Sequence, residues 1–251
     1  MNILIFISGF GNPHWQNKVA ILKKNLTLFN ATRPSNSILD VIICQYEMIE
    51  RLPSDISSFV NGSCDIIIDK GFVGDFFRKV TTPERVAKYD YILSILDDVE
   101  LNDNFNLTKM IELKNIWNLD LISPSIQFGS KAQFKYMYEV ADPSVLLRIT
   151  NACEYFCYLM DLTTFIKYQS HIREYNPFMW GVDGIIVKHI GLRVGMLNTM
   201  TMNHHYKNES YEDFDKTYQA FVRYINEYDE TPDSLAMMPS LAYAIHKVAP
   251  I

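Results

Sequence analysis

Short apolar runs alternate with amphipathic segments along the first hundred residues. Four nearly continuous apolar runs have the length of a strand: residues 2–8, 39–44, 64–68 and 91–96. Such runs are typical of parallel strands that are covered on both faces. Residues 16–29 carry apolar positions at helical spacing, and residues 83–88 predict a short helix before the last run. This alternation predicts an α/β sheet with a crevice of the nucleotide-binding type.

The second half of the chain predicts further elements with less regular spacing. We expect helices over residues 106–117, 163–172 and 240–248, a strand over residues 196–202, a short strand over residues 120–123 that Pro124 stops, and a mobile loop over residues 130–142. Residues 211–228 carry a helical apolar stripe, which is more typical of core packing than of a cofactor site. Neither an internal repeat nor a long linker interrupts the sequence. We therefore expect a single domain, with residues 1–105 as a nucleotide-binding half and 106–251 as an acceptor and catalytic half.

Composition narrows the class of protein. The 251 residues carry a net charge of −6, which argues against a nucleic-acid binder, because such proteins present a basic stripe. No apolar run approaches the roughly 20 residues that cross a bilayer, and the apolar N-terminus lacks the basic leader of a signal peptide. The four cysteines are too few for a disulfide scaffold and lack a partner pair for zinc. We expect a soluble, cytoplasmic protein with reduced core thiols.

An acidic cluster follows the fourth apolar run. Asp97, Asp98 and Glu100 come directly after residues 91–96. In open α/β sheets, ligands bind just beyond the carboxyl ends of the strands. Carboxylate oxygens at that position suit Mg²⁺ or Mn²⁺, which in turn bind substrate phosphates. The alternative is a solvated acidic turn.

Two loops after earlier strands are candidates for nucleotide binding. The loop Ser8-Gly9-Phe10-Gly11-Asn12 follows the first run, but its two glycines are not a dinucleotide fingerprint. Either it is a simple turn, or Gly9 and Gly11 let the backbone approach a base or ribose. Lys70 and Gly71, which follow the third run, join Ser8, Gly9, Gly11 and Asn12 as candidates.

Two later motifs add polar side chains to this picture. Trp180-Gly181-Val182-Asp183 precedes an apolar stretch, and His204-His205 ends the strand predicted over residues 196–202. A carboxylate such as Asp183 can take a proton from an incoming hydroxyl, and neutral imidazole can bind a metal ion. Asp183 is equally interpreted as a helix N-cap, and the histidines as a polar strand end.

The order and spacing of these motifs resemble a known family. From Lys70 to His205 the chain is similar to GT-A-fold glycosyltransferases, which use nucleotide sugars. It looks most like a little-characterised group with plant, bacterial and large-DNA-virus members. Members of this group carry a Tyr-Asp-Tyr-hydrophobic strand with an Asp-x-Asp-type motif, then Trp-Gly-x-Asp, then a strand that ends in His. The resemblance implies a mixed, mostly parallel Rossmann-type sheet flanked by helices, and it suggests a virus-encoded protein.

The resemblance also implies a metal site for Mn²⁺ or Mg²⁺. Asp98 and Glu100 would hold the ion, and Asp97 would approach the ribose or a metal-bound water. His204 aligns best with the late metal-binding histidine of the family, and His205 is its nearest substitute.

Roles on the acceptor side follow in the same way. Asp183 would be the general base or the contact to the acceptor hydroxyl. Glu154, Trp180, Gly181 and His205 would line the sugar and acceptor pocket. The implied reaction moves a hexose or pentose from a nucleotide sugar, with a UDP-sugar favoured, to a glycan or another hydroxyl acceptor. Glu154 has an alternative interpretation as a structural acid paired with Arg148.

One departure from the family pattern is compatible with a non-catalytic function. Val99 occupies the third position of the acidic motif, so Glu100 would have to supply the last ligand. A non-catalytic nucleotide- or carbohydrate-binding protein with the same fold is therefore the main alternative. A metal-dependent phosphohydrolase would need an aspartyl nucleophile or a two-metal cluster, and the remaining acids are too scattered to suggest one. The donor base, the sugar, the acceptor, the stereochemical course and the oligomeric state stay open.

Overall fold

The structure is a computed structural model of the 251-residue chain. It describes residues 1–11, 14–47, 50–130, 135–151, 153–205, 214–236 and 243–246. Within these ranges, none of the helices combines the length and the apolar character that a bilayer crossing requires.

The described residues form ten strands. These are β1 (Asn2–Phe10), β2 (Ile38–Tyr46), β3 (Cys64–Asp69), β4 (Tyr91–Ile95), β5 (Val99–Leu101), β6 (Leu121–Ile126), β7 (Val145–Thr150), β8 (Cys157–Asp161), β9 (Val194–His204) and β10 (Tyr243–His246). The four apolar runs of the N-terminal half are thus confirmed as β1 to β4.

Helices alternate with these strands in the described ranges. They are α1 (Trp15–Thr32), α2 (Val73–Val80), α3 (Pro83–Val86), α4 (Leu107–Ile116), α5 (Leu162–Gln169), α6 (Val182–Lys188), α7 (Phe214–Asn226) and α8 (Pro232–Ala236), with short 3-10 helices at η1 (Ser54–Phe59) and η2 (Lys135–Met137).

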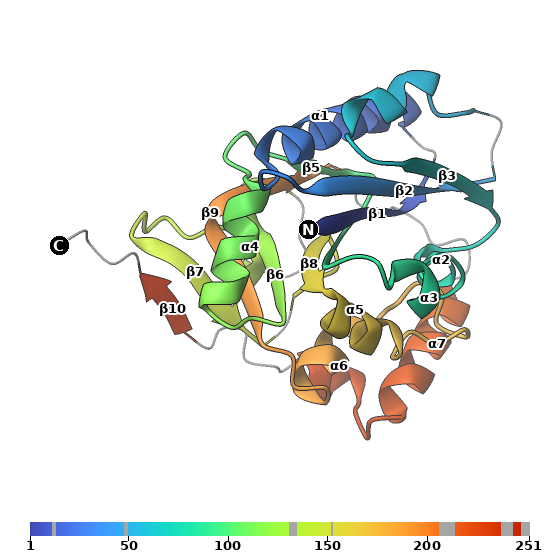
Figure 1. The fold of residues 1–251 in the computed structure, drawn as a ribbon. Coiled ribbons are helices and arrows are strands. Elements are labelled where there is room, and N and C mark those ends of the chain that lie inside the picture. The colour runs from blue at the N-terminus through green and yellow to red at the C-terminus, as the bar shows by residue number, and fades with distance from the viewer. Residues whose placement is uncertain are drawn as a thin grey trace.

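One sheet runs through both halves of the chain, in the order β10-β7-β9-β6-β8-β4-β1-β2-β3, with β5 paired to β9 (Figure 1). The strands β3, β2, β1 and β4 are parallel, as the continuous burial of β1, β2 and β4 predicts. Beyond β4 the pairing becomes antiparallel through β8, and among the described strands of that half β6 and β9 pair in parallel. The predicted mixed α/β sheet is confirmed, with its uniformly parallel part in the N-terminal half.

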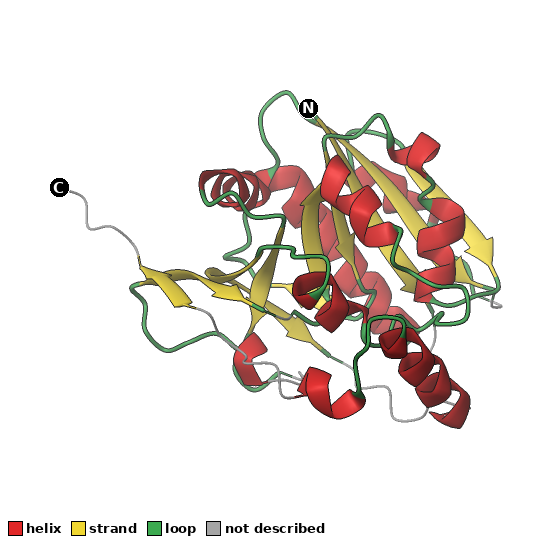
Figure 2. Ribbon diagram, turned by 90° about the horizontal axis from the view of Figure 1, so that it is seen from below, coloured by secondary structure: helices red, strands yellow, loops and turns green. Residues whose placement is uncertain are grey.

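Helices cover the parallel part of the sheet on both faces. In Figure 1, α1 lies over one face of β1 and β2, whereas α2, α3 and α5 lie on the opposite side. Figure 2, seen from below, shows the helices packed against the strands and the β10 end extending away from them. This layering explains why strands β1 and β2 are buried along nearly their whole length.

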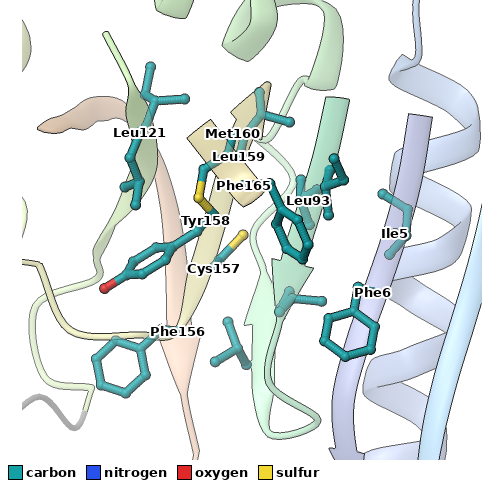
Figure 3. Packing of buried hydrophobic residues seen from close by; sticks show 14 of the residues in the cluster. Ile5, Phe6, Leu93, Leu121, Phe156, Cys157, Tyr158, Leu159, Met160 and Phe165 are labelled. Carbon is teal, nitrogen blue, oxygen red and sulfur yellow. The ribbon is translucent and has the colours of Figure 1, made fainter. Parts of the chain in front are cut away.

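Aromatic rings fill the layer between the sheet and the helices α2 and α5. Phe6 of β1 contacts Phe77 of α2 edge to face at 4.9 Å between centroids, and Phe77 stacks with Phe165 of α5 at 5.9 Å. Figure 3 shows Phe6 and Phe165 among the buried residues of this core. Because Phe77 is fully buried, truncating it to Ala should cost about 3–5 kcal/mol.

Two expectations about individual elements were wrong. The strand before Pro124 does not stop there: β6 continues to Ile126, and its register with β9 shifts between Pro124 and Ser125. Proline lacks an N–H donor, so it is tolerated where the ladder is already irregular. Residues 243–246, expected in a helix, form the edge strand β10 and pair with β7. Long-range pairing thus outweighs the local preference of the tail. The expected loop over 130–142 contains η2, and residues 131–134 lie outside the described ranges.

Candidate functional site

The acidic cluster lies at a sharp turn between β4 and β5. After Ile95, the backbone N–H of Leu96 donates to the Phe156 carbonyl at 3.0 Å, and β5 then pairs antiparallel with the end of β9. This pairing places Val99 opposite His204. The turn therefore brings the acidic residues together with the late histidines, which lie about a hundred positions away in the sequence.

Asp97 connects three elements at the base of this turn. One of its oxygens, Oδ2, accepts from the Gly11 backbone N–H at 3.0 Å and lies 2.8 Å from Lys18 Nζ of α1. The side chains of Lys18 and Asp97 are only 10% and 9% exposed. Burial raises the pKa of Asp97 to about 6, although the Lys18 ammonium opposes the rise. Asp97 thus fixes the loop after β1 and the start of α1 to the end of β4.

Asp98 faces His204 across the β5–β9 pair. The distance from Asp98 Oδ2 to His204 Nε2 is 3.2 Å. The His204 ring lies against Phe156 at 4.5 Å between centroids, and its backbone N–H donates to the Ser130 hydroxyl at 2.7 Å. The second oxygen of Asp98, Oδ1, is buried without a hydrogen-bond partner in the described part of the chain. A buried carboxylate oxygen without a donor is costly, so this atom calls for a cation or a water.

Glu100 and His205 form a separate pair nearer the surface. Glu100 contacts Lys24 Nζ at 2.6 Å through one oxygen and His205 Nε2 at 2.6 Å through the other. Burial would raise the pKa of Glu100, but these two partners outweigh it and hold the pKa below its ordinary value. His204 and His205 therefore contact different carboxylates, those of Asp98 and Glu100.

The predicted metal ligands can be tested against this geometry. In the described ranges, no three His, Cys, Asp or Glu side chains are placed to share one metal ion. The predicted ligands instead divide into the pairs Asp98–His204 and Glu100–His205, with Asp97 bound to Lys18. The Asp98–His204 pair fits a divalent ion best, because it joins an imidazole to the unpartnered Asp98 Oδ1. Mg²⁺ commonly takes one or two protein ligands and completes its shell with phosphate oxygens and waters.

Gly9, which lies inside β1 and not in the expected loop, and Gly11, which follows β1, make room for an aromatic side chain. A Cβ atom on Gly9 would lie 2.4 Å from Tyr46 Oη, and one on Gly11 would lie 2.5 Å from Tyr46 Cδ2. Gly9 also has a φ of +112°, a backbone conformation that residues with a Cβ atom rarely adopt. The close approach that these glycines permit is thus to Tyr46 of β2. Asn12 lies outside the described residues.

Lys70 and Gly71 follow β3 at the edge of the sheet, and β2 and β1 lie between them and β4. Lys70 Nζ forms an ion pair with Glu47 at 3.0 Å, and its side chain is 84% exposed. The contacts described for Lys70 therefore place it at the surface, away from the acidic turn.

Asp183 lies in the first turn of α6. The N-cap of that helix is Gly181, with a φ of +80°, so the interpretation of Asp183 as the N-cap was wrong. Its carboxylate accepts from the Tyr155 backbone N–H at 3.0 Å and lies 3.1 Å from the Tyr158 hydroxyl. The side chain is partly exposed. Burial raises its pKa to about 7, with Glu154 adding to the rise and the Tyr155 and Tyr158 hydrogen bonds opposing it.

Tyr155 links Asp183 to the acidic turn. Its backbone binds Asp183, and its hydroxyl forms hydrogen bonds with Ser8 of β1, at 2.6 Å, and with Ser94 of β4. Ser94 precedes Asp97 by three residues on the same strand end. Sequence reasoning singled out Glu154 in this segment and missed Tyr155 and Tyr158. The one sequence signal for these two tyrosines is the run of aromatic residues around Cys157, and such a run is equally typical of a core strand.

Trp180 and Gly181 pack against α7. The Trp180 ring lies 5.9 Å from Phe214 and 6.4 Å from Phe221 between centroids. A Cβ atom on Gly181 would lie 2.8 Å from Phe221 Cε2. The Trp-Gly-Val-Asp motif thus turns sharply under α7 and presents Asp183 beside Tyr155.

Arg148, considered as a partner for Glu154, donates to Ser125 Oγ and to the carbonyls of Tyr136 and Tyr138. Glu154 is partly exposed and raises the pKa of Asp183 through its charge, so the two carboxylates are near each other.

Comparison with known proteins identifies the fold of this chain but does not assign it to a family. No family model and no curated protein sequence matches this chain. The crystal structure of GalNAc-T7 with UDP, GalNAc and Mn²⁺ is similar over 91% of this chain, with a TM-score of 0.61 and 11% identity. The chain has a GT-A-like fold. It spans half the length of the GalNAc-T7 chain. The crystal structure of A197 from STIV is a weaker likeness, with a TM-score of 0.47 and 13% identity over 82% of this chain and 87% of that one.

The expected GT-A-like fold is therefore confirmed. Identity of 11% supports the fold alone, so the roles of individual residues must come from the geometry of this chain.

Proposed function

We propose that this protein is a divalent-metal-dependent glycosyltransferase that moves a sugar from a nucleotide sugar to a hydroxyl of a glycan or another acceptor. The observation that carries the proposal is the link made by Tyr155. It joins Asp183, a carboxylate with a pKa near neutrality, to the end of β4 where the acidic turn begins. In a GT-A-like fold, this is the edge of the sheet where ligands bind.

The N-terminal half would bind the donor. The loop after β1 and the acidic turn are joined by Gly11 and Asp97, so they would form one wall for the nucleotide. Asp98 and His204 would hold the divalent ion. Such an ion, when bound, stabilises the negative charge that grows on the departing nucleoside diphosphate. Lys18 adds a fixed positive charge next to Asp97.

The C-terminal half would bind the acceptor and take its proton. The acceptor oxygen would form a bond to the anomeric carbon as the bond from that carbon to the phosphate oxygen breaks. Asp183 would receive the hydroxyl proton, and its pKa of about 7 leaves it partly ionised at neutral pH. A carboxylate in this role favours direct displacement with inversion.

Nucleotide-dependent thermal stabilisation tests the donor site. The protein would be melted with UDP, GDP, dTDP and CMP, each with and without Mn²⁺. A ligand at about 100 times its Kd adds roughly 2.7 kcal/mol of stability. We expect a rise in the melting temperature for UDP that requires Mn²⁺. No rise with any of the four nucleotides at millimolar concentration would contradict the proposal.

Two acidic residues provide a variant and its matched control. Asp98→Ala should abolish the Mn²⁺-dependent rise, because it removes the carboxylate that faces His204. Asp103→Ala removes a carboxylate that is near in sequence but 94% exposed, and it should keep the rise. Equal rises in both variants would show that the acidic turn does not bind the ion.

A non-catalytic nucleotide- or carbohydrate-binding protein is the second candidate. The separation of the acids into pairs with Lys18, His204 and His205 favours it, because each acid already has a partner within the protein. Slow hydrolysis of a UDP-sugar in the presence of Mn²⁺ would exclude this alternative. Nucleotide binding without hydrolysis or transfer would support it.

A further inference from the structure

Four aromatic rings form a partly exposed surface next to the Trp-Gly-Val-Asp motif. Phe214, Tyr218 and Phe221 are spaced at helical intervals along one side of α7. The Phe214 and Tyr218 rings are stacked 6.1 Å apart with 12° between their planes. They are 55% and 41% exposed. Trp180 packs edge to face on Phe214 and Phe221. These four rings are called the aromatic platform below.

The aromatic platform is continuous with the candidate general base. Phe221 approaches Gly181 so closely that a Cβ atom there would lie 2.8 Å from its ring. Asp183 follows Gly181 by two residues in the first turn of α6. A molecule that rests on the Trp180 side of the platform therefore lies next to the segment that carries the carboxylate.

Polar side chains border the rings on α7. Tyr218 shares a surface hollow with Gln219, Val222, Arg223 and Asn226. This mixture of flat aromatic faces with amide and guanidinium groups suits a ligand that has both apolar C–H faces and hydroxyls. A pyranose ring has both. Val222 adds one aliphatic side chain to the same hollow.

We propose that the aromatic platform is the acceptor subsite and that it binds the sugar rings of an oligosaccharide. This inference rests on the proposed transferase function. Sugar C–H groups would lie on the Phe214 and Tyr218 faces, and hydroxyls would meet Gln219, Arg223 or Asn226. The terminal hydroxyl would then point toward Asp183.

Calorimetric titration with defined hexasaccharides tests the platform directly. The probes are the cellulose, xylan, chitin, mannan and maltose hexasaccharides at millimolar concentration. We expect at least one to bind the wild type. The double variant Phe214→Ala/Tyr218→Ala should bind that probe about tenfold more weakly or worse, as when aromatic anchors are removed from a binding surface. Ile116→Ala removes an apolar side chain that is 68% exposed on α4, and it should bind like the wild type.

Failure of the platform can be told apart from failure of the transferase. The UDP and Mn²⁺ melting shift should be the same in the double variant as in the wild type. A UDP shift without binding of any hexasaccharide, or with equal binding by both proteins, would overturn the platform and leave the donor site intact. Hexasaccharide binding without any nucleotide shift would uphold the platform and remove the transferase. A wild-type dimer in sedimentation that the double variant loses would identify the rings as a contact between copies and overturn the proposal.

Discussion

Replacing Gly181 with Ala should destabilise the protein more than the same change at Gly191. Both glycines have left-handed φ angles, +80° and +72°. A Cβ atom at Gly191 has no neighbour within 4 Å, whereas one at Gly181 meets Phe221 and Ile225 of α7 at 2.8 and 2.9 Å. The pair of variants therefore separates the backbone strain from the packing between α6 and α7.

The expected free energies follow from these two terms. The left-handed backbone costs an Ala about 1–2 kcal/mol, and this is the whole effect expected for Gly191→Ala. At Gly181 the added methyl also pushes against a ring packed by Trp180 and against the branched Ile225. Overpacking of this kind costs about 1–3 kcal/mol. The total for Gly181→Ala is about 2–5 kcal/mol.

Urea unfolding of both variants measures the difference. With an m-value of about 3 kcal/mol per molar urea, Gly181→Ala should unfold at about 0.3–1 M less urea than Gly191→Ala. Equal midpoints would refute the close packing of α7 on the Trp-Gly-Val-Asp turn. They would also weaken the proposed continuity between the aromatic platform and Asp183.

Three further variants test the charged groups. Lys18→Met leaves the buried Asp97 without its cation and should cost about 3–5 kcal/mol in urea unfolding at pH 8. The loss should shrink toward pH 5, where Asp97 with its raised pKa takes up a proton; equal losses at both pH values would contradict the ion pair. Tyr158→Phe removes a hydrogen bond that favours the Asp183 carboxylate, so its pKa should rise above about 7 and the acidic limb of the turnover profile should move to higher pH. A limb that stays in place would exclude Asp183 as the base. Because the pKa of Asp183 is higher in the folded state than the ordinary value of 3.8, its protonation stabilises the fold below that value, and this gain is lost as the pH rises through about 7. Between pH 3.8 and about 7 the wild type should therefore lose stability relative to Asp183→Asn. Parallel profiles of unfolding free energy against pH for the two proteins would contradict the raised pKa.

Local sequence patterns were sufficient for the framework of the N-terminal half. The apolar runs of β1 to β4 and the helical spacing of α1 are properties of neighbouring residues, and the burial of β1, β2 and β4 on two faces leaves a continuous signature. The acidic turn after β4 was equally visible, because charges that interrupt an apolar run mark a strand end. The strand at the tail, β10, was not predictable, since its partner β7 lies about a hundred residues earlier.

The identity of each partner was decided only by the tertiary structure. No sequence pattern assigns His204 to Asp98 and His205 to Glu100, because the antiparallel register of β5 and β9 makes that choice. The assignment of these residues as metal ligands stays a prediction.

The sequence by itself determined the fold class and the kinds of side chain available for chemistry, because hydrophobic spacing and residue type are local properties. Tertiary structure decided which of them meet. Gly9 and Gly11 make room for Tyr46, and Tyr155 connects Asp183 to β4. These contacts join segments far apart in the chain, and their geometry depends on sheet order and packing, which no local pattern encodes.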